Sequence, residues 1–135
     1  MDKTRHDHVM ETLRSVELDD PARIFRSYPH QLSGGLRQRA MIAQAMVCGP
    51  ELVIADEPTS SLDVTVQAKI MRLLRKLNQE RGMTVLLITH DLGMVSHLAD
   101  TIAVMTDGKI VESGKTADIL RAPKHAYTRA LIEAY

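Results

Sequence analysis

This sequence of 135 residues has few aromatic residues, a single cysteine and no net charge at pH 7. With one phenylalanine, three tyrosines and no tryptophan, it has little from which to build a surface that stacks nucleic-acid bases. The single cysteine excludes an intramolecular disulfide and suits a reducing compartment. Seventeen basic and seventeen acidic side chains balance, so no overall field attracts nucleic acid or an anionic membrane.

Long apolar runs are lacking as well. The longest, such as TVLLIT (84–89), have the length of a strand and are too short to span a membrane. The first ten residues are too polar for the apolar part of a secretory signal. We therefore expect a soluble, cytosolic chain of about one domain, which reaches a membrane only through a partner.

The sequence also has no phosphate-binding P-loop, although KIVESGKT (109–116) ends like one. That motif needs a glycine five positions before the Gly-Lys pair, because the loop wraps its backbone N–H groups around the phosphates. Here the position is occupied by Lys109, and no other glycine has the required spacing. We interpret residues 114–116 as a turn that leads into a short helix.

Apolar spacing and turn residues predict alternating helices and strands. The expected helices cover 5–17, a short segment that begins at Pro21, 36–47, the stretch between Asp63 and Gly82, 91–99, a segment that begins at Thr116, and 126–134. The expected strands are 52–55, 84–89, 101–105 and 109–114. The first two are continuously apolar, as is typical of buried parallel strands. This pattern predicts an α/β fold with a parallel sheet, preceded by a helical portion of about 48 residues.

Two adjacent carboxylates, Asp56 and Glu57, follow the first predicted strand in LVIADEP. We expect them at the carboxyl edge of the sheet, where open α/β folds bind ligands. One carboxylate there can hold Mg²⁺ through water while its neighbour orients a nucleophilic water. The alternative interpretation is a solvated acidic turn.

Ser33, Gly34 and Gly35 in LSGGLRQR open a predicted helix, whose N-terminus favours an anion. The alternative is an ordinary N-cap. His90 comes just after the second predicted strand, and Asp63 closes SSLD (60–63), where it can cap the following helix. Each of these features has a structural explanation when it is taken alone.

Their order and spacing resemble the second half of an ABC-type ATPase domain, and the resemblance covers essentially the whole chain. It implies that residues 32–36 are the ABC signature, with Ser33, Gly34 and Gly35 facing a phosphate. It further implies that residues 52–56 are Walker B, with Asp56 on the Mg²⁺ side, and that Glu57 is the carboxylate that activates water. Residues 60–63, ending in Asp63, would be the D-loop. His90 would be the switch histidine that contacts the γ-phosphate.

Two departures from the family pattern stand out. Leu36 occupies a signature position that is commonly glutamine. The P-loop, the nucleotide-stacking aromatic and the Q-loop glutamine, which precede the helical portion in the family, are not in this sequence. The resemblance therefore implies a C-terminal half, with part of the helical subdomain at 1–48, half of the ATPase core at 49–122 and a C-terminal helical segment at 123–135.

YPHQLSGGLRQR (28–39) and PKHAYTRALIEAY (123–135) resemble ATPase subunits of dipeptide, oligopeptide and nickel importers, with Ala126 at a position typically occupied by proline. The resemblance implies ATP and Mg²⁺ as cofactors. It implies as partners a second ATPase subunit bound head to tail, integral membrane permease subunits and a complementing N-terminal half, with no nucleic acid. The chain would act at the cytoplasmic face of the inner membrane.

Without a P-loop, we expect the chain alone to bind MgATP weakly or not at all and not to hydrolyse it. We also expect an uncovered strand edge and uncovered apolar faces. The main competing hypothesis is a non-catalytic half-domain, or remnant, that only pairs with an intact ATPase. Two further candidates are an ABC ATPase of DNA repair or translation and a metal-dependent phosphohydrolase that uses His90 and Asp91.

Overall fold

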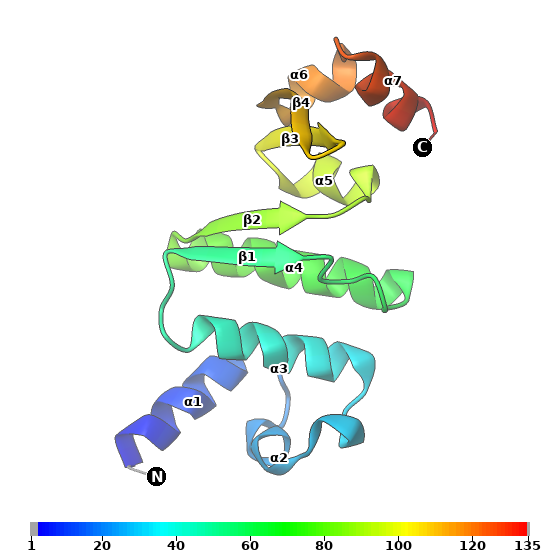
Figure 1. Cartoon of the computed structure of the whole chain (residues 1–135). Coiled ribbons are helices and arrows are strands. Elements are labelled where there is room, and N and C mark those ends of the chain that lie inside the picture. Colours follow the sequence, from blue (N-terminus) through cyan, green and yellow to red (C-terminus); the bar gives the residue numbers. More distant parts are fainter. Residues whose placement is uncertain (1–2, 135) are drawn as a thin grey trace. The chain divides into compact units, whose positions relative to one another are not determined.

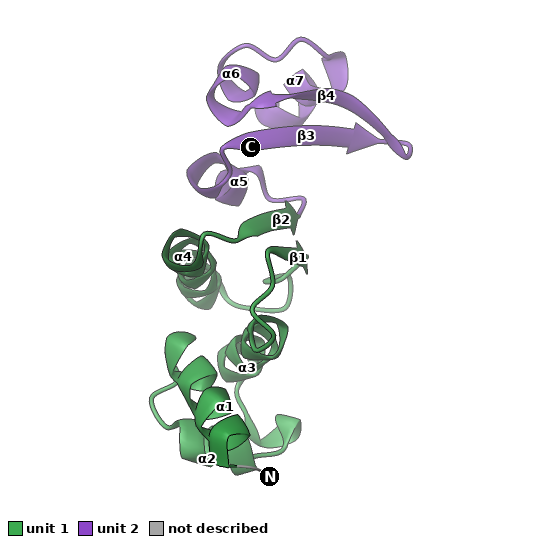
Figure 2. Ribbon diagram, turned by 90° about the vertical axis from the view of Figure 1, so that its left-hand side faces the viewer, with its two compact units in different colours: residues 1–88 green, residues 89–135 purple. Residues whose placement is uncertain are grey.

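The computed structural model describes residues 3–134, which form two compact units. The first unit ends at Ile88 and the second begins at Thr89 (Figure 2). Figure 1 labels their helices and strands. Each contains helices and a two-stranded sheet of its own. Among residues 3–134, no helix is both long enough and apolar enough to cross a membrane.

Helices alone make up the start of the first unit. They are α1 (Lys3–Ser15), α2 (Pro21–Arg26), the 3₁₀ helix η1 (Pro29–Gln31) and α3 (Gly34–Met46). Asp20 caps α2 by accepting a hydrogen bond from the Arg23 N–H at 3.0 Å. The apolar faces of these helices are buried together, and Leu13, Val16 and Met46 are at most 7% exposed. The predicted helices in this part of the chain are confirmed.

Strands β1 (Leu52–Asp56) and β2 (Thr84–Ile88) pair in parallel, with Asp56 opposite Ile88. Both strands were predicted from their continuous apolar sequence, and the structure confirms them and their parallel direction. The connection between them runs through a helix, as a parallel pair requires.

Helix α4 (Val64–Arg81) provides that connection and packs on one face of the sheet (Figure 2). Asp63 caps it by accepting a hydrogen bond from the Val66 N–H at 2.9 Å, as predicted. Gly82, at φ +64°, ends it in the left-handed conformation that glycine adopts without strain. Its buried apolar side chains are Ile70, Met71, Leu73, Leu74 and Leu77. Its basic side chains are exposed, as predicted: Lys69, Arg72, Arg75 and Lys76.

The other face of the β1–β2 sheet is open in the described part of the chain. Four large apolar side chains on it are exposed: Leu52 (52%), Ile54 (61%), Leu86 (49%) and Ile88 (47%). The prediction that both strands are buried is therefore wrong for this face. Parallel sheets are normally covered by helices on both faces, and here α4 covers only one. The expectation of an uncovered apolar face is confirmed.

The second unit contains an antiparallel hairpin, β3 (Thr101–Thr106) and β4 (Lys109–Lys115). Asp107 and Gly108 form its turn with φ of +49° and +73°, the signs that a type I′ turn requires. This confirms the predicted turn. The helices of the unit are α5 (Leu92–Leu98), α6 (Thr116–Arg121) and α7 (Ala126–Glu133).

The segment KIVESGKT is a strand followed directly by a helix. Gly114 lies opposite Ile102 in the hairpin, and strand pairing continues to Lys115. Helix α6 begins at Thr116, as predicted, but the predicted turn over 114–116 is wrong because the strand leaves no residues for it. The backbone groups of residues 109–115 take part in the pairing of β3 with β4 and do not form a loop around a phosphate.

Candidate functional site

Two carboxylates stand where β1 ends. Asp56 is the last residue of the strand, and its side chain is exposed on the open face, two positions after Ile54. Glu57 follows, is partly buried, and donates its backbone N–H to the Ile88 carbonyl at 2.9 Å. The hydrogen bond holds Glu57 at the end of β2, so both acids lie at the carboxyl edge of the sheet. That placement is the one the sequence predicted.

Glu57 has an unusual backbone conformation. Its φ of +44° lies in the left-handed region, which few residues other than glycine adopt. Strain of this kind costs on the order of 1–3 kcal/mol and persists where the surrounding structure fixes it, often at functional sites. No sequence pattern pointed to this feature, because a glutamate between a strand and a proline has no characteristic φ.

Within residues 3–134, Asp56 fits a magnesium ion only when phosphate and water supply the other ligands. Residues 3–134 contain no group of three or more His, Cys, Asp or Glu side chains that could hold a metal ion. Mg²⁺ usually keeps several waters and takes one or two carboxylates with the phosphates of its substrate. An exposed carboxylate at the edge of a sheet meets that need once phosphate and water complete the coordination.

The turn after the carboxylates is anchored at both ends. The backbone N–H and the hydroxyl of Ser60 both donate to the Glu57 carbonyl, at 3.3 and 3.2 Å. Thr59 is 2% exposed, and its carbonyl accepts a hydrogen bond from Gln67 Nε2 of α4 at 2.9 Å. Sequence reasoning missed both Thr59 and Gln67, because a buried threonine in a polar turn carries no signal of its own.

Ser33 is the N-cap of α3, as predicted. Its hydroxyl accepts a hydrogen bond from the Leu36 N–H at 3.4 Å, which is long for such a bond. The Ser33 side chain is exposed, and the hydroxyl stands at the N-terminus of a 13-residue helix. It therefore remains accessible to an anion despite its capping role.

The two glycines after Ser33 let α3 approach the start of α4. A Cβ atom on Gly34 would lie 3.0 Å from Leu62 Cδ2, and one on Gly35 would lie 2.9 Å from Val66 Cγ1. Leu62 and Val66 flank Asp63, so the structure brings both glycines close to the segment that contains this residue. The close packing therefore explains why glycine occupies these two positions, whether or not a ligand binds there.

His90 lies in the second unit, whereas Asp56 and Glu57 lie in the first. It is exposed and comes two residues after the end of β2. Its neighbours fix the local turn: the Asp91 N–H donates to Thr89 Oγ1 at 3.1 Å, and Asp91 Oδ1 accepts from the Met94 N–H at 3.0 Å. Asp91 thus caps α5, as predicted.

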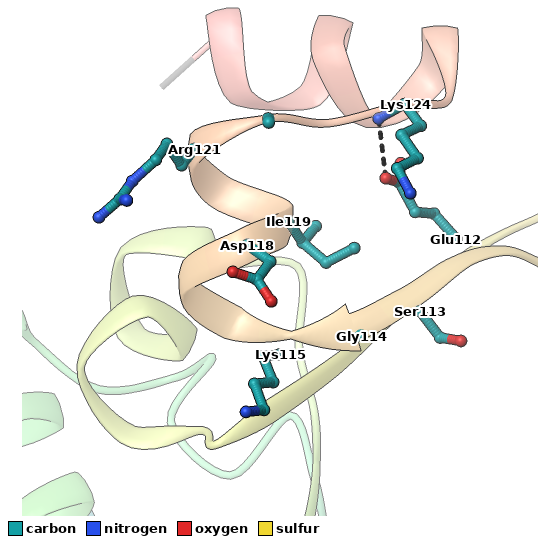
Figure 3. A pocket seen from close by; sticks show the side chains of 9 residues that line it. Glu112, Ser113, Gly114, Lys115, Asp118, Ile119, Arg121 and Lys124 are labelled. Atoms are coloured by element: carbon teal, nitrogen blue, oxygen red, sulfur yellow. Dashed lines mark hydrogen bonds between the residues drawn. The ribbon is translucent and has the colours of Figure 1, made fainter.

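A cavity of about 320 Å³ lies in the second unit along β4 and α6 (Figure 3). Lys115, Arg121 and Lys124 are among its lining residues. In Figure 3 the Arg121 side chain points away from β4, and the three cations do not converge on a common point. The arrangement therefore does not resemble a site built to hold a phosphate.

Glu112 of β4 has a structural role in the same unit. Its carboxylate accepts hydrogen bonds from the backbone N–H groups of Lys124, at 2.8 Å, and His125, at 3.0 Å. The bond from Lys124, the nearby Thr128 hydroxyl and the bond from His125 lower the pKa of Glu112 from 4.5 to about 2. The side chain thus fixes the segment before α7.

Comparison with known proteins gives the same assignment as the motifs. The profile of the ABC transporter family matches residues 2–60. The dipeptide transport ATP-binding protein DppD of Haemophilus influenzae is 52% identical over 132 residues, which are 98% of this chain and 40% of that protein. The protein of the same name from Escherichia coli is 50% identical over 131 residues, which are 97% of this chain and 40% of that protein. The chain thus spans about 40% of the length of these curated relatives.

Solved structures show the same likeness. One is a dimeric, post-hydrolysis state of the ATP-binding cassette MJ0796 bound to ADP and Pi, with 38% identity and a TM-score of 0.72 over 86% of this chain and 49% of that chain. Another is an ABC transporter assigned to the metal-chelate type, in an inward-facing conformation, with 28% identity and a TM-score of 0.83 over 99% of this chain and 50% of that chain. The predicted fold of a partial ABC-type ATPase domain is confirmed. The chain is thus similar, over nearly its whole length, to part of the ATP-binding domain of ABC transporters.

Proposed function

We propose that the chain forms the magnesium-binding and water-activating part of an ATPase site in an ABC-type peptide importer. The observation that carries this proposal is the pair of adjacent carboxylates at the carboxyl edge of the β1–β2 sheet. The identity of about 50% to dipeptide transport ATP-binding proteins supports the choice of a peptide importer.

The two carboxylates have different roles in this proposal. Asp56, exposed at the end of β1, would hold Mg²⁺, which usually keeps several of its own waters. A bound Mg²⁺ would neutralise charge on the β- and γ-phosphates. Glu57 is partly buried and fixed by its backbone bond to Ile88, so it can orient a water for attack on the γ-phosphate and accept a proton from it. His90 contacts the γ-phosphate from its own turn.

Ser33, Gly34 and Gly35 act in trans in the same proposal. The exposed Ser33 hydroxyl and the N–H groups at the start of α3 face the γ-phosphate of an ATP that a second ATPase subunit holds, with Asp63 beside them. The similar cassette MJ0796 is dimeric in a state that contains ADP and Pi, which supports the pairing of two ATPase subunits. Their head-to-tail arrangement is part of this proposal.

The same proposal divides the chain into three parts of an ABC-type ATP-binding domain. Residues 1–48 are part of the helical subdomain, residues 49–122 are the C-terminal half of the ATPase core, and residues 123–135 are a terminal helical segment. ATP hydrolysis by the completed domain is coupled to permease subunits at the cytoplasmic face of the membrane. In this proposal the chain itself supplies only part of the ATP-binding domain.

The chain alone should bind MgATP weakly or not at all and should show no ATPase activity. Phosphoryl transfer needs a lysine and backbone donors around the β- and γ-phosphates, and the only Gly-Lys-Thr tripeptide here belongs to strand β4 and helix α6. A complementing N-terminal half must supply those groups.

The test is a chimera in which this chain replaces the matching 132 residues of the Haemophilus influenzae relative. The purified chimera should hydrolyse ATP, and Glu57→Gln should lower kcat by roughly 10²–10⁴-fold because it removes the base that activates water. Glu51→Gln is the matched control: Glu51 is exposed at the other end of β1, so this variant should keep full activity.

Two results would contradict the proposal. One is a chimera whose turnover is unchanged by Glu57→Gln. The other is appreciable ATPase activity of the purified 135-residue chain without any complementing half.

A non-catalytic role is the second candidate, and one observation favours it. The cap of α3 and the packing of Gly34 and Gly35 form entirely within the first unit, so the chain can present its signature segment to an intact ATPase subunit. To test this, an intact ABC ATPase with a substituted signature serine is mixed with the chain. Restored turnover that depends on Ser33 but not on Glu57 indicates the non-catalytic role.

A further inference from the structure

The turn that follows Glu57 is bound to helix α4 by one side chain. Gln67 of α4 is partly buried, and its Nε2 donates a hydrogen bond to the Thr59 carbonyl at 2.9 Å. Thr59 is 2% exposed, and the same carbonyl also accepts the Leu62 N–H at 3.0 Å. Both lone pairs of this carbonyl are thus used. The segment between β1 and α4 (Figure 1) is therefore fixed at its middle as well as at its ends.

The backbone of Glu57 needs such support. Its φ of +44° is unfavourable for a glutamate and persists only where the surrounding structure holds it. Its carbonyl accepts the N–H of Ser60 at 3.3 Å and the hydroxyl of Ser60 at 3.2 Å, which are long for hydrogen bonds. Thr59 directly precedes Ser60, so the bond from Gln67 limits how far Ser60 can move away from Glu57.

A purely structural explanation of Gln67 is that its side chain satisfies a buried carbonyl. A buried carbonyl needs at least one hydrogen-bond partner, and the Leu62 N–H already provides one for Thr59. The second donor therefore adds restraint to a carbonyl that is already satisfied. This points to a need for a fixed geometry in the turn.

The Glu57 side chain is the group for which that geometry matters. The direction of a side chain depends on the conformation of its own backbone, so a change of φ to a negative value would redirect the carboxylate. In the proposed function this carboxylate accepts a proton from the attacking water. Displacement of a catalytic group by about 1 Å can cost roughly 10²-fold in rate.

We propose that Gln67 is a positioning residue for Glu57. Its side chain holds the turn over residues 57–62 in the conformation that directs the Glu57 carboxylate at the attacking water. Gln67 acts through the Thr59 carbonyl, and the reaction itself is carried out by Glu57. This inference rests on the proposed function, because it names the residue of α4 that sets the geometry of the same site.

The experiment uses the chimera in which this chain replaces the matching 132 residues of the Haemophilus influenzae relative. Gln67→Met keeps the length of the side chain and a similar helix propensity but has no N–H donor. It should lower kcat by roughly 10–100-fold and change KM for ATP by less than about twofold, because the carboxylate acts in the transition state. Gln67→Glu, which also lacks the donor but stays polar, should give the same result.

The matched control is Gln79→Met. Gln79 is an exposed glutamine of the same helix, so this variant should keep the kcat and KM of the wild type. Thermal denaturation of each variant identifies any that does not fold. Failure of both Gln67→Met and Gln67→Glu to fold would assign Gln67 to folding and overturn the inference.

A double-mutant cycle separates positioning from a general loss of structure. In a Glu57→Gln background the water-activating carboxylate is gone, so Gln67→Met should lower the rate by less than about twofold there. A residue that only stabilises the fold would lower the rate by the same factor in both backgrounds. Single-turnover assays with radiolabelled ATP resolve the slow rates of these variants.

The inference is overturned if Gln67→Met and Gln67→Glu both keep the kcat of the wild type. It is also overturned if their full loss of rate persists in the Glu57→Gln background. A chimera whose turnover needs Glu57 but not Gln67 refutes this inference alone. Turnover that Glu57→Gln does not lower refutes the proposed function, and this inference with it.

Discussion

Gly35 packs so closely against α4 that its substitution tests the contact directly. A Cβ atom there would lie 2.9 Å from Val66 Cγ1, and valine has little freedom to move aside because it is branched at Cβ. We expect Gly35→Ala to lower the free energy of unfolding by about 1–3 kcal/mol, as overpacking does. Chemical denaturation of the purified chain measures this change.

The double variant Gly35→Ala, Val66→Ala separates packing from a change in helix propensity. Removal of the valine methyl groups makes room for the new Cβ, so the two substitutions should be less destabilising together than their separate costs predict. Strict additivity would show that the contact between α3 and α4 is not what requires glycine at this position.

The lowered pKa of Glu112 predicts that the stability of the second unit depends on pH. Its pKa is lowered to about 2 in the folded chain, so the folded state favours the ionised carboxylate. The resulting stabilisation is fully present above the ordinary pKa of 4.5 and is lost as the pH falls through about 2. An NMR titration of the Glu112 carboxyl carbon should show the low midpoint.

A matched pair of variants assigns the effect. Glu112→Gln should weaken the dependence of thermal stability on pH in this acid range, because the side chain no longer titrates. Glu133→Gln, which removes an exposed carboxylate of α7, should leave that dependence largely unchanged. A Glu112 midpoint near the ordinary value would contradict the two backbone hydrogen bonds.

At the scale of elements, one arginine links α3 to the end of α1. Arg39 Nη1 donates to the Val16 carbonyl at 2.9 Å, to the Glu17 carbonyl at 3.2 Å and to Glu17 Oε2 at 3.0 Å. Glu17 has φ +58°, so these bonds hold a backbone conformation that is costly for a glutamate. On the α4 side, Lys76 Nζ lies 3.3 Å from Glu17 Oε1.

We expect Arg39→Ala to lower the free energy of unfolding by about 1–3 kcal/mol, since it leaves backbone carbonyls without their donor. The Arg39 side chain is 15% exposed, which keeps water from replacing it fully. Lys76→Ala should cost less than about 1 kcal/mol, because that ion pair is exposed. Urea denaturation of both variants checks this order. Arg39→Lys tests the geometry, because a single ammonium group does not reproduce the fork of the guanidinium.

The same scale shows what could be predicted from the sequence. The starts of three helices could be predicted because short polar residues, Ser33, Asp63 and Asp91, stand directly before segments with a helical apolar spacing. Strands β1 and β2 were readable from their apolar runs. Local chemistry was sufficient for these elements.

The rest depends on neighbours that are distant in sequence or outside the chain. Half-exposed Ile54 looks like a core residue in sequence, because an apolar run indicates burial without saying whether a covering layer is present. The carbonyl of buried Thr59 accepts a hydrogen bond from Gln67, eight residues away, and Glu57 has a left-handed φ that its residue type does not favour. Of the candidate site, the positions of Asp56, Ser33 and Asp63 were predictable, whereas these supports were not.

On the scale of the whole molecule, the open face and the absence of net charge act together. The chain has equal numbers of acidic and basic side chains, so electrostatic repulsion between copies is weak at neutral pH. An exposed apolar patch then favours association without a fixed stoichiometry. We expect light scattering of the isolated chain to rise with concentration, and the double variant Ile54→Lys, Leu86→Lys to suppress that rise.

A second double variant determines whether surface or charge is responsible. Gln44→Lys with Gln79→Lys adds the same two charges at exposed polar positions of α3 and α4 and leaves the apolar face unchanged. If the patch drives association, this control should reduce scattering much less than the lysines at positions 54 and 86. Equal reduction by both would assign the association to the lack of net charge, and the open face would then have no measurable affinity for apolar surfaces.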